Sequence, residues 1–366
     1  MNIFIVRRNR GFGGAERVAE RIASRFETLY PTKRLWAGET YQGRKIPGRS
    51  GPPWWRSLRF TRHLDRLNLR AGKDNVVFSL EYGPDCDIYR AGDGVHKLNV
   101  RRRFGGSPRW MLNPWHWIAP RLERKCLESA RAIIANSNLV KSLLSQTYPH
   151  LMQKIVTIYN GFDPAVFHPS QQTRAALRRE LVLPAEGTML LLSGSGFVRK
   201  GLHHCIELLA RLRREPGYHD AHLVVIGKGD AKPFQAKMKS SNVVDCIRFV
   251  GAVDDPQRYY QAADFLVLPT RHDPFSNACL EALACGCPVL TSAENGAAEI
   301  VTPATGFVFE GRYDDAEFAA ALAFIRASKT PSQAVADSVA HLRADDEFAK
   351  YVELVTTIHR QKQAAP

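Results

Sequence analysis

The sequence predicts an α/β protein built from two doubly wound, Rossmann-like domains. The length of 366 residues is large enough for two domains with separate cores. In the second half, short apolar runs alternate with segments of helical periodicity, as in parallel sheets. The first half opens with the same order: the apolar run 2–6, a glycine pair at Gly13 and Gly14, and a helical segment over 15–26.

Apolar runs and helical periods locate most of the elements. We expect the remaining strands of the first half at 75–80, 132–137 and from 154, and loops with a basic helix over 37–73. In the second half we expect strands at 189–196, 222–230, 246–253, 265–269 and 288–292, and helices at 201–215, 231–239, 255–263, 278–285 and 331–362.

Composition and cysteine usage exclude several classes of protein. No apolar run reaches the roughly 18 residues of a membrane-spanning helix, and the N-terminal run is short and followed by charge, unlike a signal peptide. The seven cysteines form no C-x-x-C pair, which favours a reduced, cytosolic protein without a metal site. Asp85-Cys86-Asp87 matches a short D-x-D metal motif, which we interpret as coincidence.

Charge divides the chain into unequal halves. Residues 1–130 hold 26 Lys and Arg against 12 Asp and Glu, whereas the remainder holds 25 against 24. All six tryptophans also lie in the first part. A basic, tryptophan-rich half beside a neutral half indicates different binding partners.

The basic half contains one segment, residues 101–125, in which tryptophans lie between arginines and lysines. Such a segment suits an anionic membrane surface, because indole rings sit at headgroup depth and cations meet phosphates. A nucleic acid is the rival partner, disfavoured by the absence of a recognised binding motif, and a core helix with a solvated basic rim is the plain alternative. The candidate membrane residues are Arg101, Arg102, Arg103, Trp110, Trp115, Trp117, Arg121 and Lys125.

Residues 265–300 carry the main candidate site. A buried strand at 265–269 ends in a polar loop, and a helix follows, so the loop lies where open parallel sheets bind ligands. The free N–H groups of the helix start favour an anion such as phosphate. Asp273 in the loop and Glu281 in the helix face this space. The spacing of Asp273 and Glu281 alone fits two interpretations equally well: carboxylates that bind sugar hydroxyls, or ordinary residues of a helix and its N-terminus.

This stretch resembles the signature of family 4 retaining glycosyltransferases, which have the GT-B fold. Glu281, Gly286, Pro288 and Val289 match that pattern, while Asp273 stands where the family has Glu and the loop reads Pro-Phe-Ser. Further matches are R-K-G at 199–201, GFGGAERV at 11–18 and DIYRAGD at 87–93, which resemble glycosyltransferases of the lipopolysaccharide core.

The resemblance implies two Rossmann-like domains facing a cleft, with a C-terminal helix returning to the first. The NGFD…F-x-P segment resembles the exit from the first GT-B domain. The implied boundaries are 1–168 for the acceptor and membrane-facing domain, 169–345 for the nucleotide-sugar domain and 346–366 for the returning helix.

The resemblance also assigns roles to residues. Lys200 and Arg199 would neutralise the leaving diphosphate, Glu281 would hold the ribose and Asp273 the sugar. Asp93 and His96 are candidates for contacting the acceptor or the reacting face of the donor, with a surface-loop histidine as the alternative for His96. The donor-binding set is Gly13, Gly14, Arg199, Lys200, Val250, Gly251, Phe275, Ser276, Asn277, Ala278 and Glu281.

These residues lead to a functional hypothesis. The chain would be a retaining, metal-independent hexosyltransferase without a cofactor, moving a hexose from a nucleotide-diphosphate sugar, UDP-glucose being the best candidate, to a lipid-linked acceptor of the lipid A–core type. It would act at the cytoplasmic face of the inner membrane and bind no nucleic acid. The alternatives are another nucleotide-sugar enzyme, such as an epimerase, and an inactive basic protein that binds membranes or nucleic acid.

Overall fold

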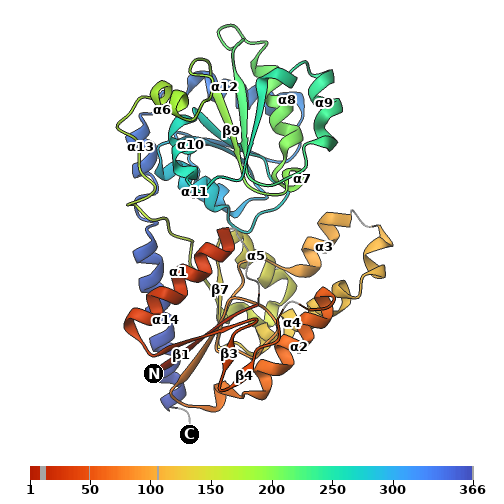
Figure 1. The fold of residues 1–366 in the computed structure, drawn as a ribbon, viewed down its shortest axis with the longest axis vertical. Helices are drawn as coiled ribbons and strands as arrows, with labels where there is room; N and C mark the ends of the chain where they lie inside the picture. The colour runs from red at the N-terminus through yellow and green to blue at the C-terminus, as the bar shows by residue number, and fades with distance from the viewer. Residues whose placement is uncertain (9–13, 49, 105–106, 365–366) are drawn as a thin grey trace. The chain divides into compact units, whose positions relative to one another are not determined.

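The chain forms two compact units. The computed structural model describes residues 1–8, 14–48, 50–104 and 107–364. Unit 1 comprises Met1–Tyr159 and Asp345–Pro366, and unit 2 comprises Asn160–Ala344 (Figure 1). Gly13 lies outside the described residues, as do the side chains of Arg102 and Arg103.

Unit 1 contains a six-stranded parallel sheet in the order β2-β1-β5-β6-β7-β8. Its strands are β1 (Asn2–Arg7), β2 (Thr32–Trp36), β5 (Asn75–Ser79), β6 (Ile88–Arg90), β7 (Ala132–Ala135) and β8 (Ile155–Thr157). The central strands are buried on both faces, which is why they read as unbroken apolar runs. The short strands β3 (Thr40–Tyr41) and β4 (Arg44–Lys45) form a separate antiparallel pair.

The helices of unit 1 cover both faces of this sheet (Figure 1). They are α1 (Gly14–Leu29), α2 (Pro53–Arg66), α3 (His96–Phe104), α4 (Trp115–Ser129), α5 (Asn138–Thr147) and α14 (Ala344–Ala364), with 3-10 turns η1 (Leu69–Ala71), η2 (Pro108–Leu112) and η3 (Pro149–Lys154). The C-terminal helix α14 belongs to this core, because Tyr351, Val355 and Ile358 are buried with residues of α1 and β1. The Tyr351 hydroxyl also accepts a hydrogen bond from Arg90 Nε at 3.0 Å.

Unit 2 contains a second six-stranded parallel sheet, in the order β11-β10-β9-β12-β13-β14. The strands are β9 (Met189–Ser193), β10 (His222–Ile226), β11 (Ile247–Gly251), β12 (Phe265–Leu268), β13 (Val289–Ser292) and β14 (Gly306–Phe309). Two α/β units with parallel sheets and a C-terminal helix that returns to the first confirm the predicted fold class.

Short helices and 3-10 turns connect these strands. They are α6 (Arg174–Glu180), α7 (Phe197–Lys200), α8 (Leu202–Leu212), α9 (Gln235–Ser240), α10 (Pro256–Ala262), α11 (Asn277–Ala284), α12 (Asp315–Ala327), α13 (Ser332–Asp337), η4 (Lys232–Phe234), η5 (Val244–Cys246) and η6 (Gly296–Ile300). Residues 331–362, predicted to be helical, form α13 and the greater part of α14, with a turn between the two helices.

Each sheet has one position where the strand order reverses. In unit 2, β9 is followed in the chain by β10 on one side, while β12 pairs with β9 on the other side. In open α/β sheets a crevice for ligands lies outside the carboxyl ends of such a strand pair. The loops after β9 and β12 therefore meet at the expected ligand position of unit 2.

Candidate active site

The loop after β9 carries the two candidate cations. Arg199 and Lys200 occupy the last turn of α7, and Gly201 joins α7 to α8 with a φ of +80°. A Cβ at Gly201 would lie 2.0 Å from the Pro269 carbonyl oxygen, so a side chain at this position collides with backbone. Only glycine allows the close approach that brings α7 against the end of β12.

Lys200 and Arg199 both bind the carboxylate of Asp273. Asp273 Oδ2 accepts from Lys200 Nζ at 2.8 Å and from Arg199 Nη1 at 3.1 Å. The Lys200 side chain is 8% exposed and that of Arg199 is 51% exposed. Burial raises the pKa of the Asp273 carboxyl, but the two cations outweigh burial, and the pKa lies below its usual range. The structure therefore brings together three of the predicted residues from two separate loops.

Backbone contacts lock these two loops to each other. The Arg199 carbonyl oxygen accepts from Thr270 Oγ1 and from the Arg271 N–H, both at 2.9 Å. Asp273 N–H donates to the Glu294 carbonyl at 3.0 Å, and its own carbonyl accepts from Gly296 N–H at 3.0 Å. The position of the Asp273 carboxylate is thus set by the segment after β13 as well as by the two cations.

The predicted phosphate-binding helix start is α11. Ser276 is its N-cap residue, Phe275 is buried, and Asn277 accepts a hydrogen bond from Asn160 Nδ2 at 2.6 Å. The buried Asn295 carboxamide oxygen accepts from the N–H groups of Ser276 and Ala297, each at 3.1 Å. Sequence analysis missed Asn295, since an asparagine followed by glycine reads as an ordinary turn.

Glu281 lies in α11, with a hydroxyl pair beside it. Tyr260 Oη donates to Glu281 Oε2 at 3.1 Å and lies 3.0 Å from Ser193 Oγ. Sequence analysis missed both hydroxyls, because Tyr260 reads as an apolar position of α10. Val250 and Gly251, two members of the predicted donor-binding set, end the edge strand β11, and the Gly251 carbonyl accepts from Gly227 N–H at 2.6 Å.

Asp93 and His96 belong to unit 1. They follow β6, and Asp93 is exposed while His96 is half-buried at the start of α3. His96 Nε2 lies 3.2 Å from His116 Nδ1. Burial, with a smaller effect of His116, lowers the pKa of His96 to about 4, so the ring is neutral at neutral pH. A neutral imidazole can accept a proton or a hydrogen bond from a sugar hydroxyl.

The start of α3 rests on a buried carboxyl group. Glu123 accepts from the His96 N–H at 2.9 Å and from the Tyr148 hydroxyl at 3.1 Å, and it is 1% exposed. Burial raises the pKa of Glu123 to about 7, although both hydrogen bonds oppose that shift. Between the unfolded-state pKa of about 4.3 and pH 7, the folded protein binds this proton more tightly than the unfolded protein does.

This difference predicts how stability depends on pH. Relative to Glu123→Gln, the wild type should lose about 3 kcal/mol of unfolding free energy as the pH rises from 4 to 8. Urea unfolding at several pH values measures the difference. Glu128→Gln, an exposed position of the same helix, should show no such pH dependence. A constant difference between wild type and Glu123→Gln would contradict the shifted pKa.

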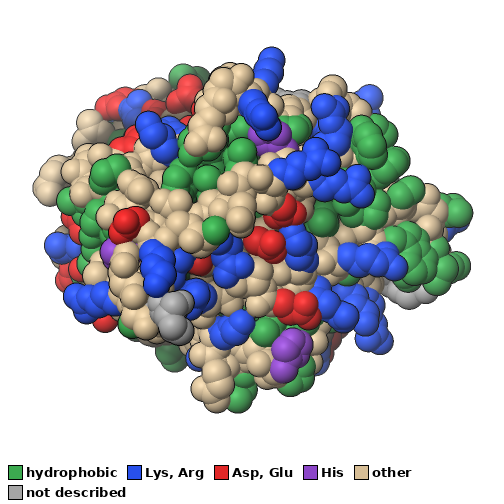
Figure 2. Space-filling model, turned by 90° about the horizontal axis from the view of Figure 1, so that it is seen from below, with side chains coloured by type: hydrophobic (Ala, Val, Ile, Leu, Met, Phe, Trp, Pro, Cys, Tyr) green, Lys and Arg blue, Asp and Glu red, His purple; other side chains and the backbone are tan. Residues whose placement is uncertain are grey.

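The predicted membrane residues separate into two groups. Trp110 and Trp117 lie together, with ring centroids 5.2 Å apart, beside the exposed Met111 and Leu112. In the view of Figure 2, hydrophobic side chains gather at the right edge of the molecule, with Lys and Arg side chains beside them. Trp115 instead packs against the core of unit 1, stacked on Tyr82 at 6.1 Å.

The remaining basic candidates also divide. Arg101 and Arg121 are exposed, and Arg121 donates to the Trp117 carbonyl at 2.8 Å. Lys125 pairs with Asp65 at 2.5 Å and lies 3.4 Å from Asp85. Within the described residues, no helix is both long and apolar enough to cross a bilayer.

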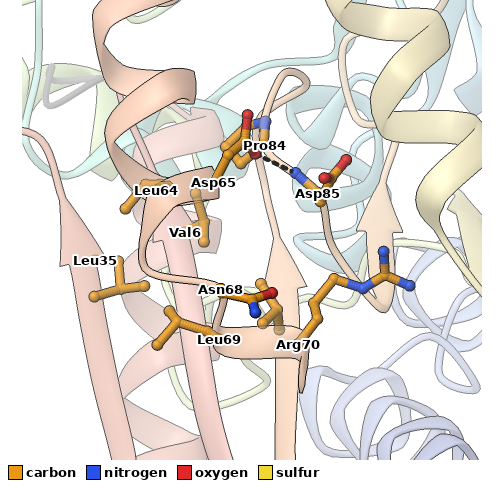
Figure 3. Close-up of a pocket in the computed structure, with 10 residues that line it drawn as sticks. Val6, Leu35, Leu64, Asp65, Asn68, Leu69, Arg70, Pro84 and Asp85 are labelled. Carbon is orange, nitrogen blue, oxygen red and sulfur yellow. Dashed lines mark hydrogen bonds between the residues drawn. The ribbon is translucent and has the colours of Figure 1, made fainter. Parts of the chain in front are cut away.

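The D-x-D triplet has a structural position in unit 1. Asp87 is 1% exposed and accepts from Val77 N–H at 2.9 Å, Lys362 Nζ at 3.2 Å and Arg70 Nε at 3.3 Å. Its neighbour Asp85 is half-exposed and donates its N–H to Asp65 at the rim of a small cavity between α2 and the sheet (Figure 3). Across the described residues, no three His, Cys, Asp or Glu side chains are grouped to hold a metal.

Comparison with known proteins agrees with this architecture. The model of Glycosyltransferase Family 4 matches residues 12–166, and that of Glycosyl transferases group 1 matches residues 173–337. The crystal structure of WaaG, a glycosyltransferase involved in lipopolysaccharide biosynthesis, has a TM-score of 0.78 at 22% identity and covers 98% of this chain and 99% of that chain. The Anabaena protein HepE in complex with UDP-glucose has a TM-score of 0.73 at 16% identity, with 98% and 100% covered.

The curated relatives are matched over different lengths. The lipopolysaccharide glucosyltransferase WaaG of Escherichia coli (strain K12) is 25% identical over 80% of each chain. The D-inositol 3-phosphate glycosyltransferase of Jonesia denitrificans is 29% identical over 55% of this chain, which spans only about half, 50%, of that relative. Both halves of the chain thus match glycosyltransferase models, and the chain belongs to the family 4 glycosyltransferases of the GT-B fold.

Proposed function

We propose that this glycosyltransferase moves a hexose, with retention of configuration and without a metal, from a nucleotide-diphosphate sugar to a lipid-linked acceptor. The observation that carries the proposal is the pairing of Lys200 and Arg199 with Asp273 at the carboxyl ends of β9 and β12. Two cations beside a helix start form a site for a diphosphate. UDP-glucose is the best candidate donor, supported by its presence in the HepE complex.

The proposed chemistry needs charge stabilisation at one place. When the bond between the sugar and the nucleotide diphosphate breaks, negative charge develops on the leaving phosphate oxygen and positive character on the sugar. Lys200 and Arg199 neutralise the phosphate, together with the N–H groups of Phe275, Asn277 and Ala278; the Ser276 N–H, which was predicted with them, is already donated to Asn295. The acceptor oxygen bonds to the same face of the sugar, and its proton passes to the departing phosphate. No protein base is required for this route.

The other residues bind and orient substrates. Glu281 accepts hydrogen bonds from the ribose, and Asp273 both holds the two cations and orients the sugar. Asp93 and His96 serve the acceptor, and Gly14, at the start of α1, belongs with Gly13 to the donor-binding set. Lipid A–core is the proposed acceptor, supported by the 25% identity to the lipopolysaccharide glucosyltransferase over 80% of both chains.

The decisive experiment measures nucleotide release with and without acceptor. We expect UDP release from UDP-glucose to depend on a lipid A–core acceptor, to persist in excess EDTA and to yield an α-linked product by NMR. UDP release that does not depend on the acceptor, or conversion of the free nucleotide sugar into an epimer, would favour the epimerase alternative. An inactive protein that still binds vesicles would favour the binding-protein alternative.

We also propose that unit 1 binds an anionic membrane at the cytoplasmic face of the inner membrane through Trp110 and Trp117. Trp117 is exposed and Trp110 is half-buried against it; Arg121 lies beside Trp117, and Arg101 is exposed on the neighbouring helix. Interfacial tryptophans contribute apolar burial, and the arginines contribute attraction to anionic headgroups.

A double substitution tests this surface. Trp110→Ser/Trp117→Ser should weaken binding to vesicles of phosphatidylglycerol and phosphatidylethanolamine about tenfold or more, because two rings lose their burial. Sedimentation with the vesicles measures the change. Trp55→Ser, another exposed tryptophan of unit 1, is the control and should bind like wild type. Equal binding by the double variant and wild type would remove this surface from the proposal.

A further inference from the structure

A chain of hydroxyl groups in unit 2 ends at Glu281. Ser193 is the last residue of β9, Tyr260 lies in α10 and Glu281 lies in α11. Ser193 Oγ is 3.0 Å from Tyr260 Oη, which is 3.1 Å from Glu281 Oε2. These two hydrogen bonds therefore link the end of β9 to the helix that follows β12, across the position where the strand order reverses.

The direction of the last hydrogen bond follows from chemistry. A carboxylate only accepts, so the tyrosine hydroxyl donates to Glu281, and Ser193 is left to donate to the tyrosine oxygen. Burial, with the nearby Glu281 adding, raises the pKa of Tyr260 well above its usual range, so the hydroxyl keeps its proton at neutral pH. Tyr260 is thus a permanent donor to this carboxylate.

Packing alone does not require the hydroxyl. The Tyr260 side chain is 2% exposed, and a phenylalanine ring would fill the same space. A buried hydroxyl without hydrogen-bond partners lowers the free energy of unfolding. The Tyr260 hydroxyl avoids this loss through its hydrogen bonds with Ser193 and Glu281. The last torsion of a glutamate has a broad energy minimum, and a fixed donor at Oε2 therefore selects the carboxylate orientation.

We propose that Tyr260, anchored by Ser193, is a positioning residue that holds the Glu281 carboxylate in the orientation that binds the ribose hydroxyls of the nucleotide. This inference rests on the proposed function, in which Glu281 contacts the ribose. It adds that the discrimination between ribose and deoxyribose depends on a tyrosine that does not itself touch the nucleotide.

The test compares ribonucleotides with their 2′-deoxy analogues. Calorimetric titrations of UDP against 2′-deoxy-UDP, with the ADP and GDP pairs in parallel, give a discrimination ratio for each protein. We expect wild type to favour the ribonucleotide by about tenfold or more, as for a hydrogen bond to a charged acceptor. Glu281→Gln should abolish most of this ratio, and Tyr260→Phe should lower it by about threefold to tenfold.

Two further variants separate positioning from folding. Tyr259→Phe removes a hydroxyl from the adjacent residue of α10 and should leave the ratio unchanged. Ser193→Ala removes the anchor while Tyr260 stays in place, and should lower the ratio less than Tyr260→Phe does. If Tyr260→Phe is too unstable to titrate, the Ser193→Ala ratio decides the question.

The outcomes distinguish the inference from the function beneath it. A Tyr260→Phe variant that loses affinity for both members of a pair equally, or for neither, overturns the positioning role alone. Wild type that binds UDP but does not prefer it to 2′-deoxy-UDP also overturns the inference, while the diphosphate site stands. Wild type that binds none of the nucleotides overturns the proposed function and the inference with it.

Discussion

Lys200→Met should reduce the turnover number by about a hundredfold to a thousandfold, the usual cost of removing one preorganised donor from a developing negative charge. Lys200 is the buried member of the cation pair and has its ammonium 2.8 Å from Asp273. Methionine keeps the length of the side chain and removes the charge. Steady-state transfer assays at saturating donor measure the loss, because the effect falls on the step in which the diphosphate departs.

Controls for this variant address charge and folding separately. Lys237→Met removes a lysine of α9 that pairs with Glu207 at 2.8 Å, and it should retain wild-type turnover. Lys200→Met leaves Asp273 with Arg199 as its remaining cation, which costs some stability. Lys200→Met/Asp273→Asn removes both charges and should recover part of that stability while staying inactive. Wild-type turnover in Lys200→Met would refute the assignment of the phosphate site.

Asp87→Ala should lower the unfolding free energy by about 3–5 kcal/mol, the largest stability effect we expect from a single substitution in unit 1. The carboxylate compensates the buried Lys362 ammonium, which is 5% exposed, and accepts from the Val77 N–H. Removing it leaves the charge of the Lys362 ammonium without its carboxylate, although the ammonium still donates to the Arg70 and Asn75 carbonyls, and it leaves the buried Val77 N–H without this acceptor. Urea unfolding followed by tryptophan fluorescence measures the loss, and all six tryptophans lie within residues 1–130.

Asp85→Ala is the matched control for this prediction. Its side chain is 43% exposed, and its ion pair with Lys125 spans 3.4 Å, so the substitution should cost less than about 1 kcal/mol. A metal-binding D-x-D motif predicts the opposite pattern, in which either substitution abolishes a metal-dependent activity and leaves stability near wild type. That pattern would show that the interpretation of the triplet as coincidence is wrong.

The strands and helices that could be located from sequence are those marked by a pattern of neighbouring residues. Parallel strands buried on both faces appear as apolar runs, which is why β1, β5, β9, β10 and β12 were located from sequence. The edge strand β2 escaped prediction because Thr32–Trp36 is not an apolar run: it contains the exposed Lys33 and the half-buried Arg34, which pairs with Glu20 and Glu27. The segment 331–362 was predicted to be helical, but the turn that separates α13 from α14 was not placed within it.

Three residues of the predicted site could be placed near one another from sequence for the same reason. Lys200, Arg199 and Asp273 stand next to glycines and strand ends, which are visible in sequence, and the structure brings them into contact. Tyr260 and Asn295 act through partners 21 and 19 residues away, and no local pattern encodes such contacts. Composition alone does not predict which tryptophans are available to a membrane, because Trp115 shares its segment with Trp110 and Trp117 but packs against the core.

A thermal-shift comparison of nucleotide binding tests the central claim most directly. UDP, ADP, GDP and their sugars are added to wild type and to Lys200→Met, because a ligand that binds only the folded state raises the apparent stability. We predict that one nucleoside diphosphate and its sugar raise the melting temperature of wild type, and that Lys200→Met loses most of this shift. Equal shifts in both proteins, or no shift in wild type with any of these ligands, would contradict a diphosphate site at Lys200.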